Sequence, residues 1–317
     1  MRDAVMNVGL LYDERFLEHR APAGHPECEQ RLEACVQALE QAELWSRFER
    51  VDARRASAEQ LGLCHEEPYI RRVLGAEGLV GQLDHDTFMS PGSVEAALLA
   101  AGGCIALAER IADGALARGF ALVRPPGHHA EPAASGGFCY FGNAALAAAT
   151  FAQRGMRVAI VDYDVHHGNG TQDIFYRRGD VFFASMHRYG GYYPGTGAAS
   201  ERGVGEGEGK TLNVPLSAGC DGATFLARFE DAIAPAVSAF APDMLVVSAG
   251  YDAHERDPLG GLRVDDAAFA TIAKRLVQLG SEHCDGRVLF VLEGGYDFQA
   301  LGAGVVSATR ALMEVAA

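Results

Sequence analysis

The chain has 317 residues, a formal net charge of −15 and a hydrophobic content of 49%. This length can bury a large core as one big α/β domain or two smaller ones, whereas the acidic balance disfavours nucleic-acid binding, which depends on basic patches that face phosphate. No stretch approaches the ~18 consecutive apolar residues of a membrane span and residues 1–4 lack the apolar run of a secretory leader, so we expect a cytoplasmic protein.

Short apolar runs alternate with longer stretches of helical periodicity along the chain. Strands are expected at 5–11, 119–123, 157–161, 180–186, 210–214, 243–249 and 287–292. Helices are expected at 29–43, 93–113, 142–153, 221–240, 265–280 and 297–315, with Asp221 and Asp265 as N-caps. This alternation predicts a parallel sheet covered by helices on both faces, without a linker that would divide residues 1–317 into two domains.

The seven cysteines are scattered and form no CxxC pair. This pattern indicates neither a disulfide framework nor a cysteine-rich zinc site. We expect them to be reduced thiols.

Polar residues follow four of the predicted strands. The segment Arg124–Ala130 with its His-His pair follows the strand at 119–123, and Asp162–Gly170 follows the strand at 157–161. Gly250-Tyr251-Asp252 and Glu293-Gly294-Gly295-Tyr296 follow the strands at 243–249 and 287–292. Ligands of open parallel sheets collect beyond the carboxyl ends of the strands, so the four segments are expected to converge on one pocket.

The most informative segment contains Asp162, Asp164 and His166 at alternate positions. If this segment is extended, the three side chains point the same way. Packing alone explains the trio poorly, because burying unpaired charges is costly without a cation or a partner. The pattern therefore predicts a metal site.

Residue types suggest how such a site would work. Asp164, His166 and Asp252 fit the three-ligand count of catalytic zinc. His128 and His129 suit general acid–base chemistry, and the Tyr296 phenol suits hydrogen bonding to a developing oxyanion. Each has a simpler explanation alone, since histidine pairs are often structural, tyrosines often only pack and Asp252 could be a turn residue. Together they predict metal-assisted hydrolysis and favour an amide as the substrate.

At these residues the chain resembles the histone deacetylase superfamily, which includes bacterial histone-deacetylase-like amidohydrolases and acetylpolyamine amidohydrolases. The resemblance implies the arginase–deacetylase α/β fold, with one domain and a mostly parallel eight-stranded sheet flanked by helices. It covers nearly the whole chain and rests on Gly24–Glu27, Arg31-Leu32, Asp86-Thr87, Ser90–Ser93, Arg124–Ala130, Gly136–Cys139, Asp162–Thr171, Pro194–Gly197, Asn213–Leu216, Gly250–His254, Asp257–Gly260 and Glu293–Tyr296.

The resemblance implies a function for each matching residue. Asp164, His166 and Asp252 would bind one catalytic zinc ion, His128 and His129 would handle protons, and Tyr296 would be the oxyanion donor. Asp162 would hydrogen-bond His128 and Asn169 would hydrogen-bond His129.

The resemblance also implies a substrate tunnel and a second cation site. Gly137, Phe138, Tyr193 and Leu259 would line the acyl-lysine tunnel, with Arg31 near the acetate exit. A structural potassium ion would be held by main-chain oxygens of Asp162, Asp164 and His166 together with Ser185 and Met186.

We expect a deacylase that acts on acyl-lysine or a related small amide. Acetylpolyamine is the alternative substrate. Two features count against it: Leu259 stands where the resemblance places the glutamate gatekeeper of the polyamine-specific animal enzyme, and 75–92 is too short for the inserted loop of the bacterial acetylpolyamine enzymes. The acidic net charge counts for it, because it favours a cationic substrate. The sequence leaves open the length of the acyl chain and whether the protein forms a homo-oligomer.

Two other classes are less compatible with the sequence. A binuclear ureohydrolase would need further aspartates where Gly168 and His254 stand. A non-catalytic acyl-lysine binder would have no need for His128, His129 and Tyr296.

Overall fold

Apolar runs rich in valine, leucine and phenylalanine form the central sheet of the computed structural model, which describes residues 7–314. The sheet has the strand order β2-β1-β5-β10-β9-β6-β7-β8, and all its neighbouring strands are parallel. The strands are β1 (Val8–Leu11), β2 (Glu49–Val51), β5 (Arg118–Ala121), β6 (Val158–Asp162), β7 (Val181–Arg188), β8 (Thr211–Leu216), β9 (Met244–Ala249) and β10 (Val288–Leu292). Every residue of β5, β6, β9 and β10 is buried, as expected for strands covered on both faces.

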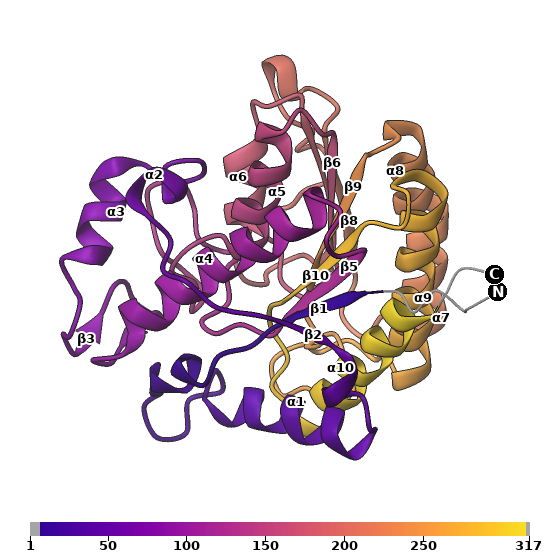
Figure 1. The fold of residues 1–317 in the computed structure, drawn as a ribbon. Helices are drawn as coiled ribbons and strands as arrows, with labels where there is room; N and C mark the ends of the chain where they lie inside the picture. Colours follow the sequence, from indigo (N-terminus) through magenta and orange to yellow (C-terminus); the bar gives the residue numbers. More distant parts are fainter. Residues whose placement is uncertain (1–6, 315–317) are drawn as a thin grey trace.

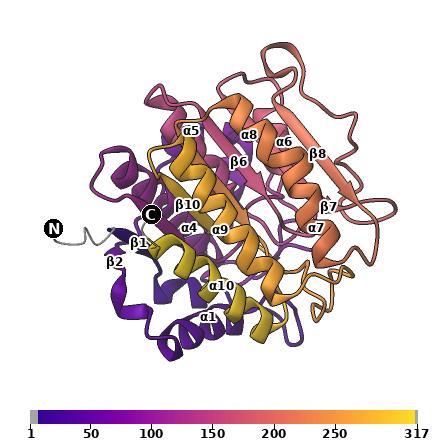
Figure 2. The same ribbon diagram turned by 90° about the vertical axis from the view of Figure 1, so that its right-hand side faces the viewer.

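Helices cover both faces of this sheet (Figures 1 and 2). One layer contains α4 (Ser93–Ala112), α5 (Asn143–Gln153) and α6 (Asn169–Phe175). The other contains α7 (Gly222–Arg228), α8 (Ala234–Phe240), α9 (Asp266–His283) and α10 (Phe298–Met313), with α1 (Gln30–Gln41) packed against α10.

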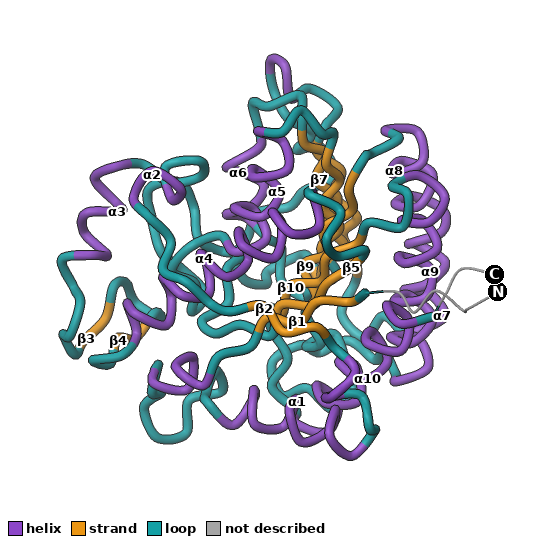
Figure 3. The backbone as a smooth tube through the Cα atoms, in the orientation of Figure 1, coloured by secondary structure: helices purple, strands orange, loops and turns teal. Residues whose placement is uncertain are grey.

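Smaller elements lie around this framework. The helices α2 (Ala58–Leu61) and α3 (Glu67–Leu74) and the antiparallel pair β3 (Gly81–Gln82) and β4 (Phe88–Met89) lie to one side of the main sheet (Figure 3). Four short 3-10 or π segments complete the described elements: Glu14–Glu18, Trp45–Arg47, Gly205–Gly207 and Phe229–Ile233.

The predicted single-domain α/β fold with an eight-stranded parallel sheet is confirmed. All seven predicted strands are present, with ends shifted by a few residues. Residues 5 and 6 of the first predicted strand and residue 315 of the last predicted helix lie outside the described residues. The helix expected at 221–240 is interrupted by the π-helical turn Phe229–Ile233. Both predicted N-caps are confirmed, because Asp221 accepts from the Thr224 N–H and Asp265 from the Ala268 N–H.

Two further expectations concern the whole chain. All seven cysteines lie in the described residues and are free thiols, as predicted. Among residues 7–314, no helix combines the length and the apolar character that crossing a membrane requires.

Candidate active site

The four polar segments converge because they follow four strands that are consecutive in the sheet, β5, β10, β9 and β6. In a parallel sheet all carboxyl ends lie at the same edge. His128 and His129 come from the loop after β5, Tyr296 from the loop after β10, Asp252 from the loop after β9 and Asp164 with His166 from the loop after β6. One edge of the sheet thus collects every predicted catalytic side chain.

Two buried carboxylates converge on one imidazole nitrogen at this edge. Nδ1 of His166 lies 3.0 Å from Oδ2 of Asp252 and 3.2 Å from Oδ1 of Asp164. One ligand atom from each of the three residues lies within 4.8 Å of the other two. Two carboxylates of zero exposure beside each other are costly without a cation, and this donor set suits zinc.

The charges of this cluster shift its pKa values strongly. Burial and the neighbouring Asp164 raise the pKa of Asp252 to about 7. Although burial opposes it, the carboxylates of Asp252 and Asp164 raise the pKa of His166 to about 10. Both shifts mean that the adjacent carboxylates make the cluster retain protons when no cation is present, and a bound metal ion would displace these protons.

The chain bends between these ligands, so the expectation that Asp162, Asp164 and His166 lie in one extended segment was wrong. The strand β6 ends at Asp162, so the alternation of a strand does not align the side chains. Instead, the Asp162 carboxylate accepts the Asp164 N–H at 3.0 Å, and the Asp164 carboxylate accepts the His166 N–H at 2.9 Å. Such side-chain to main-chain bonds are typical of aspartate in turns. Asp164 and His166 still meet at the metal cluster.

The tandem histidines are held by the two predicted partners. Nδ1 of His128 donates to Asp162 at 2.9 Å, and Nδ1 of His129 donates to the Asn169 side-chain oxygen at 2.7 Å. The Asn169 amide is oriented in turn, because its nitrogen donates to Glu131 at 2.8 Å. With Nδ1 protonated, Nε2 of a neutral ring keeps its lone pair and can accept a proton.

The two imidazoles differ in charge preference. Burial lowers the pKa of His129 well below its usual range, and the adjacent His128 and His166 lower it further. Against the effect of burial, the carboxylates of Asp164 and Asp162 raise the pKa of His128 well above its usual range. The pair thus combines a neutral ring with a charged one.

Tyr296 and Arg31 lie together beside the cluster. The Arg31 guanidinium carbon is 5.1 Å from the centroid of the Tyr296 ring. Nε of Arg31 donates to the Gly295 main-chain oxygen at 2.7 Å, and Nη1 donates to the buried Glu27 at 3.1 Å. Burial raises the pKa of the Tyr296 phenol well above its usual range despite the nearby guanidinium. The phenol therefore stays protonated and can donate a hydrogen bond.

A cavity of about 250 Å³ leads to these groups. Its walls include all four predicted tunnel residues: the side chains of Phe138, Tyr193 and Leu259 and the main chain of Gly137. Its floor includes His129, His166 and Tyr296. Phe138 lies edge-on to Tyr296 with ring centroids 6.2 Å apart, and Tyr193 lies edge-on to His129 at 5.0 Å. A Cβ at Gly137 would collide with the His129 ring, so only glycine fits there. The cavity suits a slender aliphatic chain.

Comparison with known proteins assigns the family. A model described as "Histone deacetylase domain" matches residues 25–312. Rice (Oryza sativa subsp. japonica) histone deacetylase 10, chloroplastic, is 41% identical over 98% of this chain and 76% of its own length. A probable deacetylase of Archaeoglobus fulgidus is 37% identical over 93% of this chain and 82% of its own length. The chain belongs to the histone deacetylase family.

A solved structure supports the same assignment for the fold of this histone deacetylase family member. The crystal structure of the HDA15 HD domain superposes with a TM-score of 0.93 at 39% identity, covering 98% of this chain and 89% of the other. The arginase–deacetylase fold is therefore confirmed.

Two residues of this family member line the cavity without having been predicted to do so. The Tyr192 ring stacks on the His166 ring at 5.1 Å with an interplanar angle of 10°. Asp86 borders the cavity and accepts the Gly137 N–H at 3.0 Å. The adjacent aromatic pair Tyr192-Tyr193 was a usable signal for the first. Asp86 belongs to the Asp86-Thr87 motif of the family resemblance, but that motif did not indicate a place at the cavity.

The five residues expected at a potassium site lie beside β6 and β7. Asp162 pairs with Ser185 in the sheet, and Ser185 and Met186 are buried. Within residues 7–314, no hydrogen bond is donated to the main-chain oxygens of Asp164 and His166. These two carbonyls are free to face a cation.

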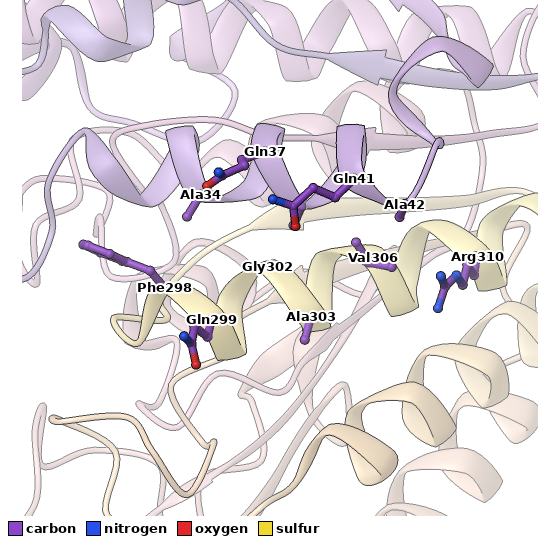
Figure 4. Close-up of a pocket in the computed structure, with 11 residues that line it drawn as sticks. Ala34, Gln37, Gln41, Ala42, Phe298, Gln299, Gly302, Ala303, Val306 and Arg310 are labelled. Atoms are coloured by element: carbon purple, nitrogen blue, oxygen red, sulfur yellow. The ribbon is translucent and has the colours of Figure 1, made fainter.

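A second hollow lies between α1 and α10 (Figure 4). Its volume is about 520 Å³, and its lining includes Gln37 and Gln41 of α1 together with Gln299, Val306 and Arg310 of α10. Arg310 is its one titratable side chain. This groove has no group suited to acid–base or metal chemistry, so the strand-end cavity is the candidate active site.

Proposed function

We propose that the chain is a zinc-dependent amidohydrolase that removes acetyl or other acyl groups from the amine of lysine side chains or related small amides. One observation carries the proposal: the buried cluster of Asp164, His166 and Asp252 lies at the base of a narrow aromatic cavity, together with the tandem histidines and Tyr296. Family membership supports the same reaction class.

Asp164, His166 and Asp252 would hold the zinc ion. When bound, it supplies a Lewis acid that polarises the scissile carbonyl and makes water more acidic. The remaining steps are carried by side chains of the protein. Phe138 and Tyr193 enclose the aliphatic stem of the substrate and exclude water from it.

Proton transfer is assigned to the histidine pair. His129 is neutral with a free Nε2, so it accepts the proton of the attacking water. When the C–N bond breaks, the departing amine takes a proton from one of the two histidines, of which His128 is held in place by Asp162. The Tyr296 hydroxyl donates a hydrogen bond to the oxyanion that forms from the carbonyl oxygen, and removing one such donor typically costs ~10²–10³ in rate.

A structural potassium ion bound by Asp162, Asp164, His166, Ser185 and Met186 is part of the proposal. The free carbonyls of Asp164 and His166 support it. Such an ion would stiffen the bend that presents the zinc ligands.

Acetylpolyamine is the alternative substrate, and one observation favours it. Asp86 borders the cavity, and its neighbour Asp84 adds a second carboxylate. A second ammonium group on the substrate would be attracted to these acids.

A substrate panel on the purified protein tests the proposal, with zinc content measured in parallel. The panel contains acetyl-lysine peptides, longer-acyl lysines and N-acetylputrescine. We expect stoichiometric zinc and turnover of acyl-lysine. Preference for N-acetylputrescine would select the alternative, and no turnover of any acylated amine would refute both.

A further inference from the structure

Asp257 is a buried carboxylate that connects two loops of the cavity. It is 8% exposed. Its Oδ2 accepts the main-chain N–H of Tyr296 at 2.7 Å. Its Oδ1 accepts the N–H groups of Leu259 at 2.9 Å and Gly260 at 3.2 Å. One side chain thus holds both the predicted oxyanion donor and the cavity wall.

The wall segment Leu259-Gly260 is also held from its other side. The Tyr192 hydroxyl donates to the Leu259 carbonyl, and Nη1 of Arg188 donates to the Gly260 carbonyl at 3.2 Å. A Cβ at Gly260 would collide with the main-chain oxygen of Asp252, so the segment lies directly against a residue of the metal cluster. With both its N–H groups and both its carbonyls bonded, this segment is a rigid support.

We propose that Asp257 is a positioning residue that fixes the main chain of Tyr296 against this rigid segment, so that the phenol stays aimed at the carbonyl of the substrate. The inference rests on the proposed function, because it assigns Asp257 an effect on turnover that acts through the Tyr296 hydroxyl. Displacement of a catalytic group by about 1 Å can lower the rate by roughly 10²-fold.

The arrangement of N–H groups makes this carboxylate difficult to replace by an amide. Both oxygens of Asp257 face N–H donors. In Asp257→Asn the amide oxygen can accept on one side only, and the NH₂ group then faces N–H donors on the other. A matched control is Asp297→Asn. The Asp297 carboxylate accepts the Ala300 N–H at the start of α10, where asparagine caps equally well, and it lies 3.4 Å from Nε of the exposed Arg256, an ion pair of small energetic weight.

A double-mutant cycle with Tyr296→Phe tests the inference on the zinc-loaded protein. The measurement is kcat and KM for an acetyl-lysine peptide. We expect Asp257→Asn to lower kcat about 10- to 100-fold in the unsubstituted protein. In the Tyr296→Phe background it should cost less than about threefold, because the hydroxyl it positions is absent. Asp297→Asn should stay within about twofold in both backgrounds.

Other outcomes would overturn either the positioning role of Asp257 or the proposed function. A kcat for Asp257→Asn within twofold of the unsubstituted value, or an equal loss in both backgrounds, would overturn the positioning role while leaving the proposed function intact. No turnover by the unsubstituted protein would overturn the proposed function and this inference with it.

A second variant covers the case in which Asp257→Asn does not fold. Asp257→Glu keeps two acceptor oxygens but lengthens the arm between the wall segment and Tyr296. We expect the same non-additivity with Tyr296→Phe and about a tenfold loss of kcat. Unchanged kcat in Asp257→Glu would count against the inference.

Discussion

The floor and the walls of the cavity are built differently. On the floor, Asp162, Asp164 and Asp252 have zero exposure, and each accepts hydrogen bonds from neighbouring main chain or histidine. On the walls, Tyr193 and Leu259 are each 36% exposed and come from loops. The floor is suited to one kind of chemistry, whereas the walls decide which substrate reaches it.

The comparison predicts a division of effects. Substitutions on the floor should change zinc content or kcat for every substrate. Substitutions on the walls should change KM and substrate preference while leaving the chemical step in place.

The largest effect is expected for Asp164→Ala on the floor. The variant removes one of two carboxylates that face His166, so it should lose zinc and show only background deacylation. Elemental analysis and a deacylation assay measure both. Retention of stoichiometric zinc would exclude Asp164 as a ligand.

Tyr296→Phe should have the next largest effect. The ring and its contacts with Phe138 and Arg31 remain, so only the hydrogen bond to the oxyanion is lost. We expect kcat to fall ~10²–10³-fold with zinc content unchanged. A loss below about tenfold would contradict the role of the phenol.

Asp162→Asn should have a smaller effect, because Asp162 acts through His128. The carboxylate accepts both the His128 Nδ1–H and the Asp164 N–H, and an amide can accept only one of them. Loss of such a partner typically costs 10- to 100-fold in activity or metal affinity. Titration with zinc measures the metal affinity, and kcat measures the activity. If both are unchanged in Asp162→Asn, Asp162 does not position His128 for catalysis.

Leu259→Ala on the wall should have the smallest effect. Partial exposure limits the lost apolar contact to about 1 kcal/mol, or roughly fivefold in KM. The kcat for an acetyl-lysine peptide should be unchanged, and longer acyl-lysines should gain relative to acetyl-lysine. A large fall in kcat alone would show that wall and floor do not act separately.

The same two regions differ in how much the sequence predicts. The floor residues follow buried strands directly, and an apolar run ending in aspartate or histidine is visible without knowledge of distant contacts. The alternation of strands and helices predicts a parallel sheet, so the shared position of these residues at the carboxyl ends could be predicted from the sequence. The bend after Asp162 could not.

The walls depend on contacts that are distant in the chain. Tyr192 is placed by its bond to the Leu259 carbonyl, and Asp257 by its bond to the Tyr296 N–H. Neither bond leaves a periodic signal. The missed edge strand β2 shows the same limit, because only Val51 of its three residues is buried and its pairing with β1 is set by the fold.

Removal and return of the metal tests the central claim most directly. The purified protein would be treated with a chelator, and deacylation of an acetyl-lysine peptide would be measured before treatment, after it and after zinc is added back. We predict that activity disappears with the zinc and returns at one equivalent per chain, and that Asp164→Ala does not recover. Full activity in the zinc-free protein would contradict the assignment of Asp164, His166 and Asp252 as the metal centre of an amidohydrolase.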